Sequence, residues 1–370
     1  MKMKMKRWIA LTLGLTLLAG CTPKPQPTPA ATPTPAAEPT LTPAPETAAV
    51  HIAMLKGPTG LGAAKLMEEA ELGTLSGGKE YDFLLCGDPS EAVALLTKGE
   101  VDIAALPTNL ASTLYHKTDG DVQLLALNTF GVLYILENGE EIQSMADLEG
   151  RTVHAYGQGA NPEFVLNYLL EKSGVERSSV DVQWHPSTDE VSTLMAAGEG
   201  DVCMLPVPAA TAVLMQNENV RQALDLTEEW DKAGGDGVLT MGCVVARAGF
   251  VREHPEAVED FLAEYEGSIS YMTGPANLSD AAHLAEKQGI VPKAAVAEKA
   301  IPAANLCFVT GDDMMDGIQG YYQVLFQADP ASIGGSIPDG AFYYRPIQPF
   351  SSITPAGEPL GQGWIFDGGK

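Results

Sequence analysis

The chain contains one segment twice, and this repeat limits the possible folds more than any other feature of the sequence. Residues 91–112 align without a gap on residues 190–211, and eight positions are identical at a spacing of 99 residues. In each copy we expect a helix that ends at a glycine and a buried strand that begins after an aspartate. A Leu-Pro pair then marks the point where the strand leaves its sheet. The chain should therefore build the same unit twice.

The segments before the two copies complete each unit. A strand, a glycine-rich turn and a helix precede a second strand, and in the later copy Asn161 is a plausible N-cap with Pro162 at the first helical position. This order makes each unit a βαβαβ half. Alternating strands and helices predict an α/β fold of two lobes, each a mainly parallel sheet flanked by helices. The expected strands are 50–55, 80–87, 151–156 and 180–185, and the expected helices are 61–73 and 161–174.

The remaining segments suggest how the chain passes between the lobes. The apolar segment 122–137 should complete the first lobe and then cross to the second, and a return crossing is expected near 237–247. Four helical segments that follow should join the first lobe: 255–273, 279–289, 293–301 and 312–327. We therefore assign 49–137 plus 240–344 to lobe 1, 138–239 to lobe 2 and 345–370 to a C-terminal tail.

The N-terminus carries an export signal. A basic start and an apolar run too short to span a bilayer make residues 1–20 a signal peptide. Leu18 to Cys21 looks like a lipobox, so we expect Cys21 to be lipidated and to anchor an exported protein to the outer face of the cell membrane. The alternative is an ordinary signal peptide with a chance cysteine. Residues 21–48 consist of this cysteine and a Pro/Thr/Ala-rich tether, which favours an extended spacer.

Charge and cysteine usage exclude several classes of function. The net charge is −26, which argues against binding to nucleic acid or to anionic lipid. The remaining cysteines are isolated in apolar runs, so a metal site is not expected. We interpret them as buried free thiols, with one long-range disulfide as the alternative. They are Cys86, Cys203, Cys243 and Cys307.

Three segments carry a resemblance to a known family: GEVDIAALPTN at 99–109, the stretch 145–175 and the stretch 333–344. They resemble the solute-binding proteins of bacterial ABC importers in the SsuA/THI5-like (NMT1) group, which includes nitrate, sulfonate, taurine and thiamine-precursor binders. The resemblance implies a periplasmic-binding-protein-like fold of type II with a ligand cleft between the lobes. It also implies a monomer without enzymatic activity or cofactor that captures a small organic solute and delivers it to an ABC permease and ATPase.

Two other functions stay open at this point. One is a ligand-sensing lipoprotein that docks on a membrane receptor. The other is an enzyme, because the THI5-like group includes a thiamine-pyrimidine synthase. That enzyme would need a histidine and clustered cysteines near the cleft, whereas the cysteines here are isolated. No GxSxG, HExxH or CxxC motif occurs, and the single GxG at 157–159 is weak evidence for a dinucleotide.

Candidate ligand-binding residues follow from the expected sheets, because ligands bind outside the carboxyl ends of parallel strands. The loops there in lobe 1 hold Gly57, Pro58, Thr59, Gly60, Thr108, Asn109, Asn128 and Thr129. Those in lobe 2 hold Gly157, Gln158, Gly159, Ala160, Asn161, Pro206 and Val207. At the two Leu-Pro exits, Thr108-Asn109 offers hydrogen bonds and Val207-Pro208 an apolar wall, which suits a ligand that is polar on one side.

Each candidate also has a structural interpretation. Glycine-rich turns between strand and helix are required sterically with or without a ligand, and the hydroxyl and amide groups of lobe 1 can serve the local backbone. Lys56 is interpreted as a solvated charge that a closed cleft could use. Trp184 and Trp230 either stack on a ligand or pack within the protein. His154 and His185 either donate a hydrogen bond to the ligand or have a structural role. Because Lys56 is the only basic residue in these loops, we expect a neutral or singly charged solute.

Overall fold

The computed structural model describes residues 49–234 and 237–353. These described residues belong to one compact unit. The signal peptide, Cys21 and the tether lie outside the described residues, as do residues 354–370 of the tail. Within the described part, no helix is long and apolar enough to cross a membrane.

The first sheet has six strands in the order β11-β4-β10-β3-β1-β2. Nearly every position of its inner strands is buried, as expected for a sheet covered on both faces by helices. The strands are β1 (Val50–Leu55), β2 (Tyr81–Cys86), β3 (Ile103–Pro107), β4 (Val122–Phe130), β10 (Thr240–Arg247) and β11 (Leu306–Val309).

The second sheet has five strands in the order β7-β6-β8-β5-β9. Its parallel set β7-β6-β8 repeats the arrangement β2-β1-β3 of the first sheet, with the same strand order along the chain. The duplicated segment therefore builds the same βαβαβ unit twice, as predicted. The strands are β5 (Leu133–Asn138), β6 (Thr152–Tyr156), β7 (Asp181–His185), β8 (Val202–Pro206) and β9 (Val220–Asp225).

Most strands of each sheet run in the same direction, as the sequence predicted, and the exceptions are β10 and β11 in the first sheet and β5 in the second. β10 pairs antiparallel with β3 and β4, and β5 pairs antiparallel with β8 and β9. The reason is the connection between the lobes. β5 and β10 each begin at the edge of their sheet that faces the other lobe, because the chain has just crossed at that edge. The carboxyl ends of the parallel strands lie at the same edge, so β5 and β10 run in the opposite direction.

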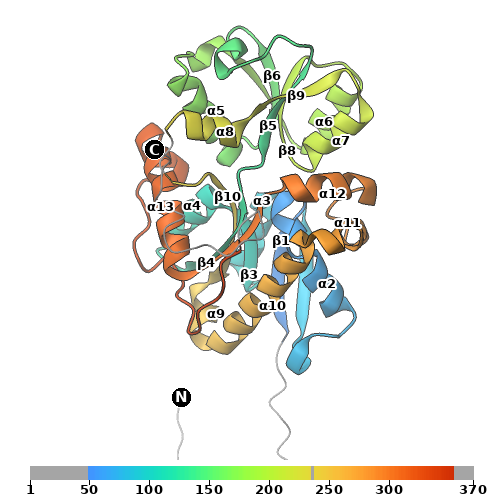
Figure 1. Cartoon of the computed structure of the whole chain (residues 1–370). Coiled ribbons are helices and arrows are strands. Elements are labelled where there is room, and N and C mark those ends of the chain that lie inside the picture. Colours follow the sequence, from blue (N-terminus) through green and yellow to red (C-terminus); the bar gives the residue numbers. More distant parts are fainter. Residues whose placement is uncertain (1–48, 235–236, 354–370) are drawn as a thin grey trace, which may run out of the picture. The chain divides into compact units, whose positions relative to one another are not determined.

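Helices flank both sheets, and the two lobes lie one above the other in the described globule (Figure 1). In α10, apolar side chains recur at three- and four-residue spacing from Val258 to Met272, and these are buried. The helices are α1 (Pro58–Leu61), α2 (Ala64–Glu71), α3 (Pro89–Lys98), α4 (Thr108–Lys117), α5 (Asn161–Lys172), α6 (Thr188–Ala196), α7 (Ala209–Gln216), α8 (Leu226–Lys232), α9 (Ala248–Glu253), α10 (Pro255–Thr273), α11 (Leu278–Lys287), α12 (Ala294–Ala300) and α13 (Gly311–Ala328).

Two short segments connect the lobes. The first lies between Phe130, the last residue of β4, and Leu133, the first of β5. Residues 133–137 thus belong to the second sheet. The lobe boundary expected at 137/138 was placed too late, because the apolar run 122–137 continues through the crossing without a change in composition. At the crossing, a Cβ on Gly131 would lie 2.2 Å from Thr227 Oγ1, so only glycine fits there. The return crossing precedes β10, which begins at Thr240.

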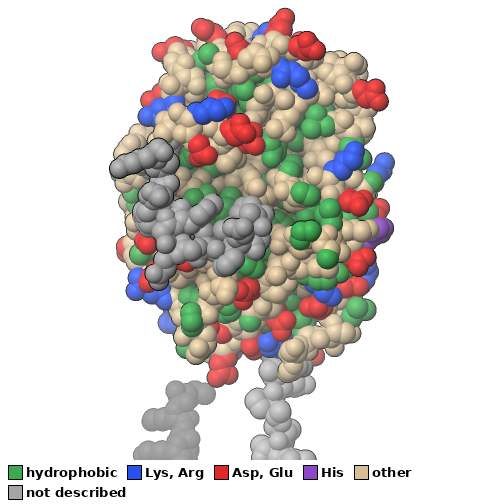
Figure 2. All heavy atoms as spheres, in the orientation of Figure 1, with side chains coloured by type: hydrophobic (Ala, Val, Ile, Leu, Met, Phe, Trp, Pro, Cys, Tyr) green, Lys and Arg blue, Asp and Glu red, His purple; other side chains and the backbone are tan. Residues whose placement is uncertain are grey.

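Trp230 and the four cysteines belong to the core. Trp230 is fully buried, and its ring packs against those of Tyr168 and Tyr321 at centroid distances of 4.8 and 5.5 Å. It is therefore a packing residue. The four predicted thiols are free and buried, which confirms the first of the two interpretations. Burial raises the pKa of Cys86 to about 11, so this thiol is protonated at neutral pH. On the face shown in Figure 2, acidic side chains are spread over both lobes.

Candidate functional site

A cavity of about 1330 Å³ lies between the two lobes. Its walls are the segments that follow three strands of each lobe: β1, β2 and β3 on one side, and β6, β7 and β8 on the other. These are the equivalent strands of the two repeated units, so the duplication places six strand ends around one space. The segment from Glu286 to Pro292, between α11 and α12, adds a further wall from the first lobe.

Ten of the predicted site residues line this cavity. The first-lobe group follows β1, where Gly57 has a φ of 97° that favours glycine, and the second-lobe groups follow β6 and β8. The ten are Gly57, Pro58, Thr59, Gly157, Gln158, Gly159, Ala160, Asn161, Pro206 and Val207.

The other five predicted residues do not line the cavity: Gly60, Thr108, Asn109, Asn128 and Thr129. Gly60 is buried in α1, where a Cβ would lie 2.0 Å from Leu55 O, so the glycine is required for packing. The four polar residues are at most 1% exposed. Asn128 Nδ2 donates to Thr59 O at 3.2 Å and to the Tyr265 hydroxyl at 3.0 Å. The four polar side chains thus bond to the protein's own groups. This is the structural interpretation that the sequence analysis gave as the alternative to ligand binding.

Asn161 joins the two lobes rather than capping its helix. The N-cap position of α5 is Ala160, and the Asn161 side chain is fully buried against first-lobe groups. Its Nδ2 donates to Thr108 Oγ1 at 2.9 Å and to Met241 O at 2.8 Å. Its Oδ1 accepts from the Tyr321 hydroxyl at 2.8 Å and from Asn109 N at 3.3 Å. We call Thr108, Asn109, Asn161, Tyr321 and Met241 O the interlobe cluster.

The interlobe cluster fixes the second-lobe loop that precedes Asn161. Asn109 Nδ2 also donates to Gly159 O at 3.4 Å, and Tyr322 donates to Thr108 O at 2.8 Å. Because buried amides and hydroxyls are costly unless they are hydrogen-bonded, these contacts favour one defined arrangement of the Gly157–Asn161 loop against the first lobe.

Few formal charges line the cavity. Lys56 is the basic residue among the lining side chains, and it is exposed and makes no ion pair with any described residue. Three carboxylates also lie there, from Asp88, Asp189 and Glu286. Asp88 caps α3, because its Oδ1 accepts from Ser90 N at 2.7 Å. The lining therefore lacks the clustered cations that a strongly charged anion would need.

Aromatic and histidine side chains form part of the second-lobe wall. Tyr156, Trp184 and His185 stand at the ends of β6 and β7. Burial, and then the charge of Asp88 from the other lobe, raise the pKa of Tyr156. Trp184 is thus placed as a possible stacking surface, one of the two interpretations made from the sequence.

The two histidines form a pair behind this wall. His154 Nδ1 lies 3.0 Å from His185 Nε2, so one ring donates to the other. Burial and the neighbouring His185 lower the pKa of His154. Glu190 Oε1 lies 3.5 Å from His185 Nδ1. These contacts engage both ring nitrogens of His185.

The sequence reasoning missed the segments after β2 and β7. Both contribute to the lining, the first through Gly87 to Ser90 and the second through Pro186 to Asp189. The signal was present, since each expected strand is followed by a Pro-Ser pair and then an acidic residue, a typical start for a helix. Across the described part of the chain, no group of three or more His, Cys, Asp or Glu side chains could hold a metal ion.

Solved structures with the same fold include several binding proteins. An ABC transporter protein from Parabacteroides distasonis has a TM-score of 0.63 at 21% identity, over 80% of this chain and 99% of that one. The periplasmic aliphatic sulphonate-binding protein SsuA from Escherichia coli has a TM-score of 0.64 at 15% identity, over 82% and 94%. The periplasmic nitrate-binding protein NrtA from Synechocystis PCC 6803 has a TM-score of 0.54 at 15% identity, over 70% and 71%. The predicted two-lobed α/β fold is thus confirmed.

The sequence comparison gives the family. Among curated proteins no match is found. The family described as NMT1/THI5 like matches residues 81–277, a range that includes both copies of the repeat. Because this range is more than half of the 370 residues, the chain belongs to the NMT1/THI5-like family.

Proposed function

We propose that this protein is the solute-binding component of an ABC importer and that it captures one small organic solute between its lobes. The observation that carries the proposal is the cavity formed by equivalent strand ends of both repeated units. Its volume of about 1330 Å³ is ample for a small organic molecule. The solved binding proteins that share this fold support it.

Capture would follow from the way the lobes are joined. We take lobe 1 as the unit built on the first sheet and lobe 2 as the unit built on the second, connected only by short crossings near Gly131 and Leu239. Such crossings act as hinges, so a solute that contacts both lobes would stabilise their closed arrangement. The permease of the importer would then recognise that arrangement.

The lining chemistry narrows the solute. With Lys56 as the single basic side chain and three carboxylates around it, we favour a neutral or singly charged molecule over a strong anion. Among the classes expected from the sequence, this places pyrimidine- or thiamine-precursor-like solutes before nitrate and sulfonates. A solute with an aromatic ring would find a stacking surface at Trp184. We propose binding without turnover.

Two neighbouring residues of α7 allow a sharp test. Ala212 lines the cavity, whereas Thr211 faces away from it. Ala212→Trp should fill the cavity and abolish solute binding, and Thr211→Trp, with the same bulk one position earlier, should leave binding unchanged. Native mass spectrometry of the gently purified chain would identify a bound solute. Calorimetry with pyrimidines, sulfonates and nitrate would then measure its binding to both variants.

The outcomes separate the competing functions. Stoichiometric binding that Ala212→Trp abolishes supports the proposal, and formation of product from the bound molecule would instead support a THI5-like enzyme. Solute uptake by vesicles that contain the cognate permease and ATPase separates import from sensing. No binding of any solute by the unaltered chain would overturn the proposal.

We also propose that the protein is exported and held at the outer face of the cell membrane through a lipid on Cys21, and that it acts as a monomer. Labelled palmitate should be incorporated into the unaltered protein. Cys21→Ser should lose the label and move the protein from the membrane fraction to the soluble fraction. Retention of Cys21→Ser in the membrane fraction would contradict the anchor.

A further inference from the structure

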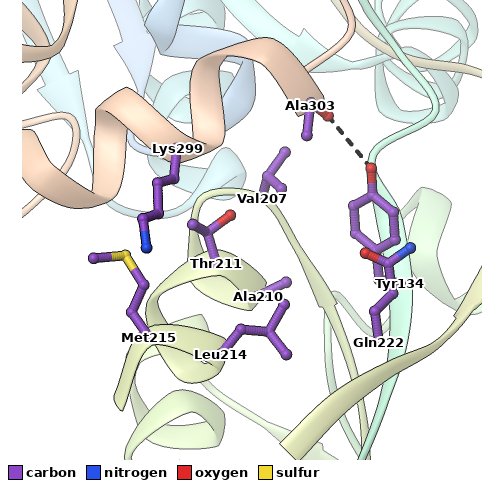
Figure 3. Close-up of a pocket in the computed structure, with 9 residues that line it drawn as sticks. All are labelled: Tyr134, Val207, Ala210, Thr211, Leu214, Met215, Gln222, Lys299 and Ala303. Carbon is purple, nitrogen blue, oxygen red and sulfur yellow. Dashed lines mark hydrogen bonds between the residues drawn. The ribbon is translucent and has the colours of Figure 1, made fainter. Parts of the chain in front are cut away.

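A second and smaller pocket lies between the lobes, behind helix α7. It has a volume of about 280 Å³ and is bounded by α7 and β5 of the second lobe and by α12 and the following turn of the first. Tyr134 closes one side, where its hydroxyl donates to Ala303 O at 3.5 Å (Figure 3). A molecule in this second pocket would contact both lobes.

Helix α7 separates the second pocket from the cavity. Ala209, Ala212 and Gln216 line the cavity, at positions that share one face of the helix. On another face, Thr211 and Leu214 line the second pocket together with Ala210 and Met215. The two spaces are therefore distinct along the helix, although they meet at Val207, which lines both.

The second pocket is apolar with a single charge. Its walls come mainly from Val207, Ala210, Leu214 and Met215, the last of which is 38% exposed although it is a large hydrophobic side chain. Lys299 extends from α12 toward α7, and its ammonium group lies near Met215 and Thr211 (Figure 3). Thr211 adds a hydroxyl to the lining of the pocket.

Charge complementarity indicates what this pocket can hold. Lys299 makes no ion pair with any described residue, and no carboxylate lines the pocket, although the chain has 48 acidic residues. An apolar wall with one unpaired ammonium group matches a molecule with a short apolar chain and one carboxylate. A pocket of about 280 Å³ limits that molecule to a small one.

We propose that the second pocket is a binding site for a small amphipathic monocarboxylate, distinct from the cavity that binds the transported solute. The carboxylate pairs with Lys299, and the apolar chain lies against Leu214 and Met215. The site is independent of which solute the cavity binds, because α7 stands between the two.

Hexanoate, hexylammonium and hexan-1-ol are suitable probes, since they share a chain length and differ in the head group. Calorimetry with the purified full chain should show saturable binding of hexanoate and no binding of hexylammonium, with hexan-1-ol weaker than hexanoate. Lys299→Gln should weaken hexanoate binding about ten-fold, the loss of one charge-assisted hydrogen bond. Lys293→Gln, an exposed lysine of the same region that lines neither space, should leave it unchanged.

The α7 pair gives the positional test. Thr211→Trp should abolish hexanoate binding and Ala212→Trp should not, the reverse of the pattern expected for the solute of the cavity. The opposite pattern for hexanoate would place it in the cavity and overturn the proposal. Equal binding of hexylammonium, or no effect of Lys299→Gln, would also overturn it. Because Lys299 is exposed, its variant tests the site without risk to the fold.

Discussion

Replacing Asn161 tests whether the interlobe cluster holds the two lobes together. Its side chain makes three hydrogen bonds of 2.8 to 2.9 Å and one of 3.3 Å, all to groups outside the second sheet. At a net contribution of about 1 kcal/mol for each of the three short bonds, Asn161→Ala should lower the free energy of unfolding by about 3 kcal/mol. A folded unit of this size would then lose about 4–5 °C in melting temperature.

Asn167 provides a matched control on the same helix. It is the same residue type in α5, and its buried Oδ1 has no hydrogen-bond partner among the described residues. Asn167→Ala should therefore change the free energy of unfolding by less than about 0.5 kcal/mol. Urea unfolding followed by tryptophan fluorescence is a suitable assay, because Trp230 packs against Tyr321 of the cluster.

A double-mutant cycle assigns the loss to the cluster itself. Tyr321→Phe removes the hydroxyl that donates to Asn161 Oδ1 and should cost about 1 kcal/mol in the unaltered protein. In the Asn161→Ala background it should cost much less, which gives a coupling energy of about 1 kcal/mol. Equal costs for Asn161→Ala and Asn167→Ala, or additive effects in the cycle, would refute the role of the cluster. Small-angle scattering should also show a larger radius of gyration for Asn161→Ala.

Three further predictions follow from single positions. Gly131→Ala should destabilise the protein by about 1–3 kcal/mol in urea unfolding, since its Cβ would lie 2.2 Å from Thr227 Oγ1. Gly267→Ala, at a helical position with nothing within 4 Å, should instead stabilise it by about 0.5–1 kcal/mol, and a loss in both variants would contradict this reasoning. Glu137→Ala should cost about 2–3 kcal/mol, because the 3% exposed carboxylate accepts from Arg221 Nη2 at 2.6 Å and from the backbone N–H groups of Glu141 and Ile142. A cost below about 1 kcal/mol would show that these contacts are already solvated. The lowered pKa of His154 means that the folded state binds fewer protons than the unfolded state, so its contribution is complete above the unfolded pKa of about 6.5 and is lost as the pH falls below it. His154→Gln should flatten that part of the stability profile below about pH 6.5, and an unchanged slope would rule this group out as its source.

The repeat made much of the fold predictable. Glycine stops, the apolar strands and the Pro162 helix start all depend on local sequence, so the βαβαβ units and the later helices could be placed to within a few residues. The crossing at Gly131 could not, because the apolar run 122–137 is continuous and only the pairing of β5 with β8 shows where the second sheet begins. The antiparallel strands could not be predicted for the same reason. The direction of a strand depends on which sheet it joins, and this is decided by contacts between residues far apart in the sequence.

The predicted loops that a glycine-rich turn marks line the cavity, whereas the residues chosen for their polarity alone do not. Thr108, Asn109, Asn128 and Thr129 have side chains that could bind a solute, yet each is buried against the protein's own groups. Local sequence cannot decide between these uses, because the partners of Thr108 and Asn109 come from Asn161 and from the C-terminal part of the chain.

The segments after the two Leu-Pro pairs differ, one being polar and the other apolar. This difference was expected to suit a ligand that is polar on one side, and the structure gives it another explanation. The polar exit after Leu106 does not offer its hydrogen bonds to a solute, since Thr108 and Asn109 use them in the interlobe cluster. The apolar exit after Leu205 places Val207 between the cavity and the second pocket. One copy of the repeat thus supplies the contact that holds the lobes together, and the other supplies the partition between two spaces. If the cavity binds a solute as proposed, the polar side chains that recognise it would come from the loops after β1, β2, β6 and β7, and substitutions there should change solute specificity most.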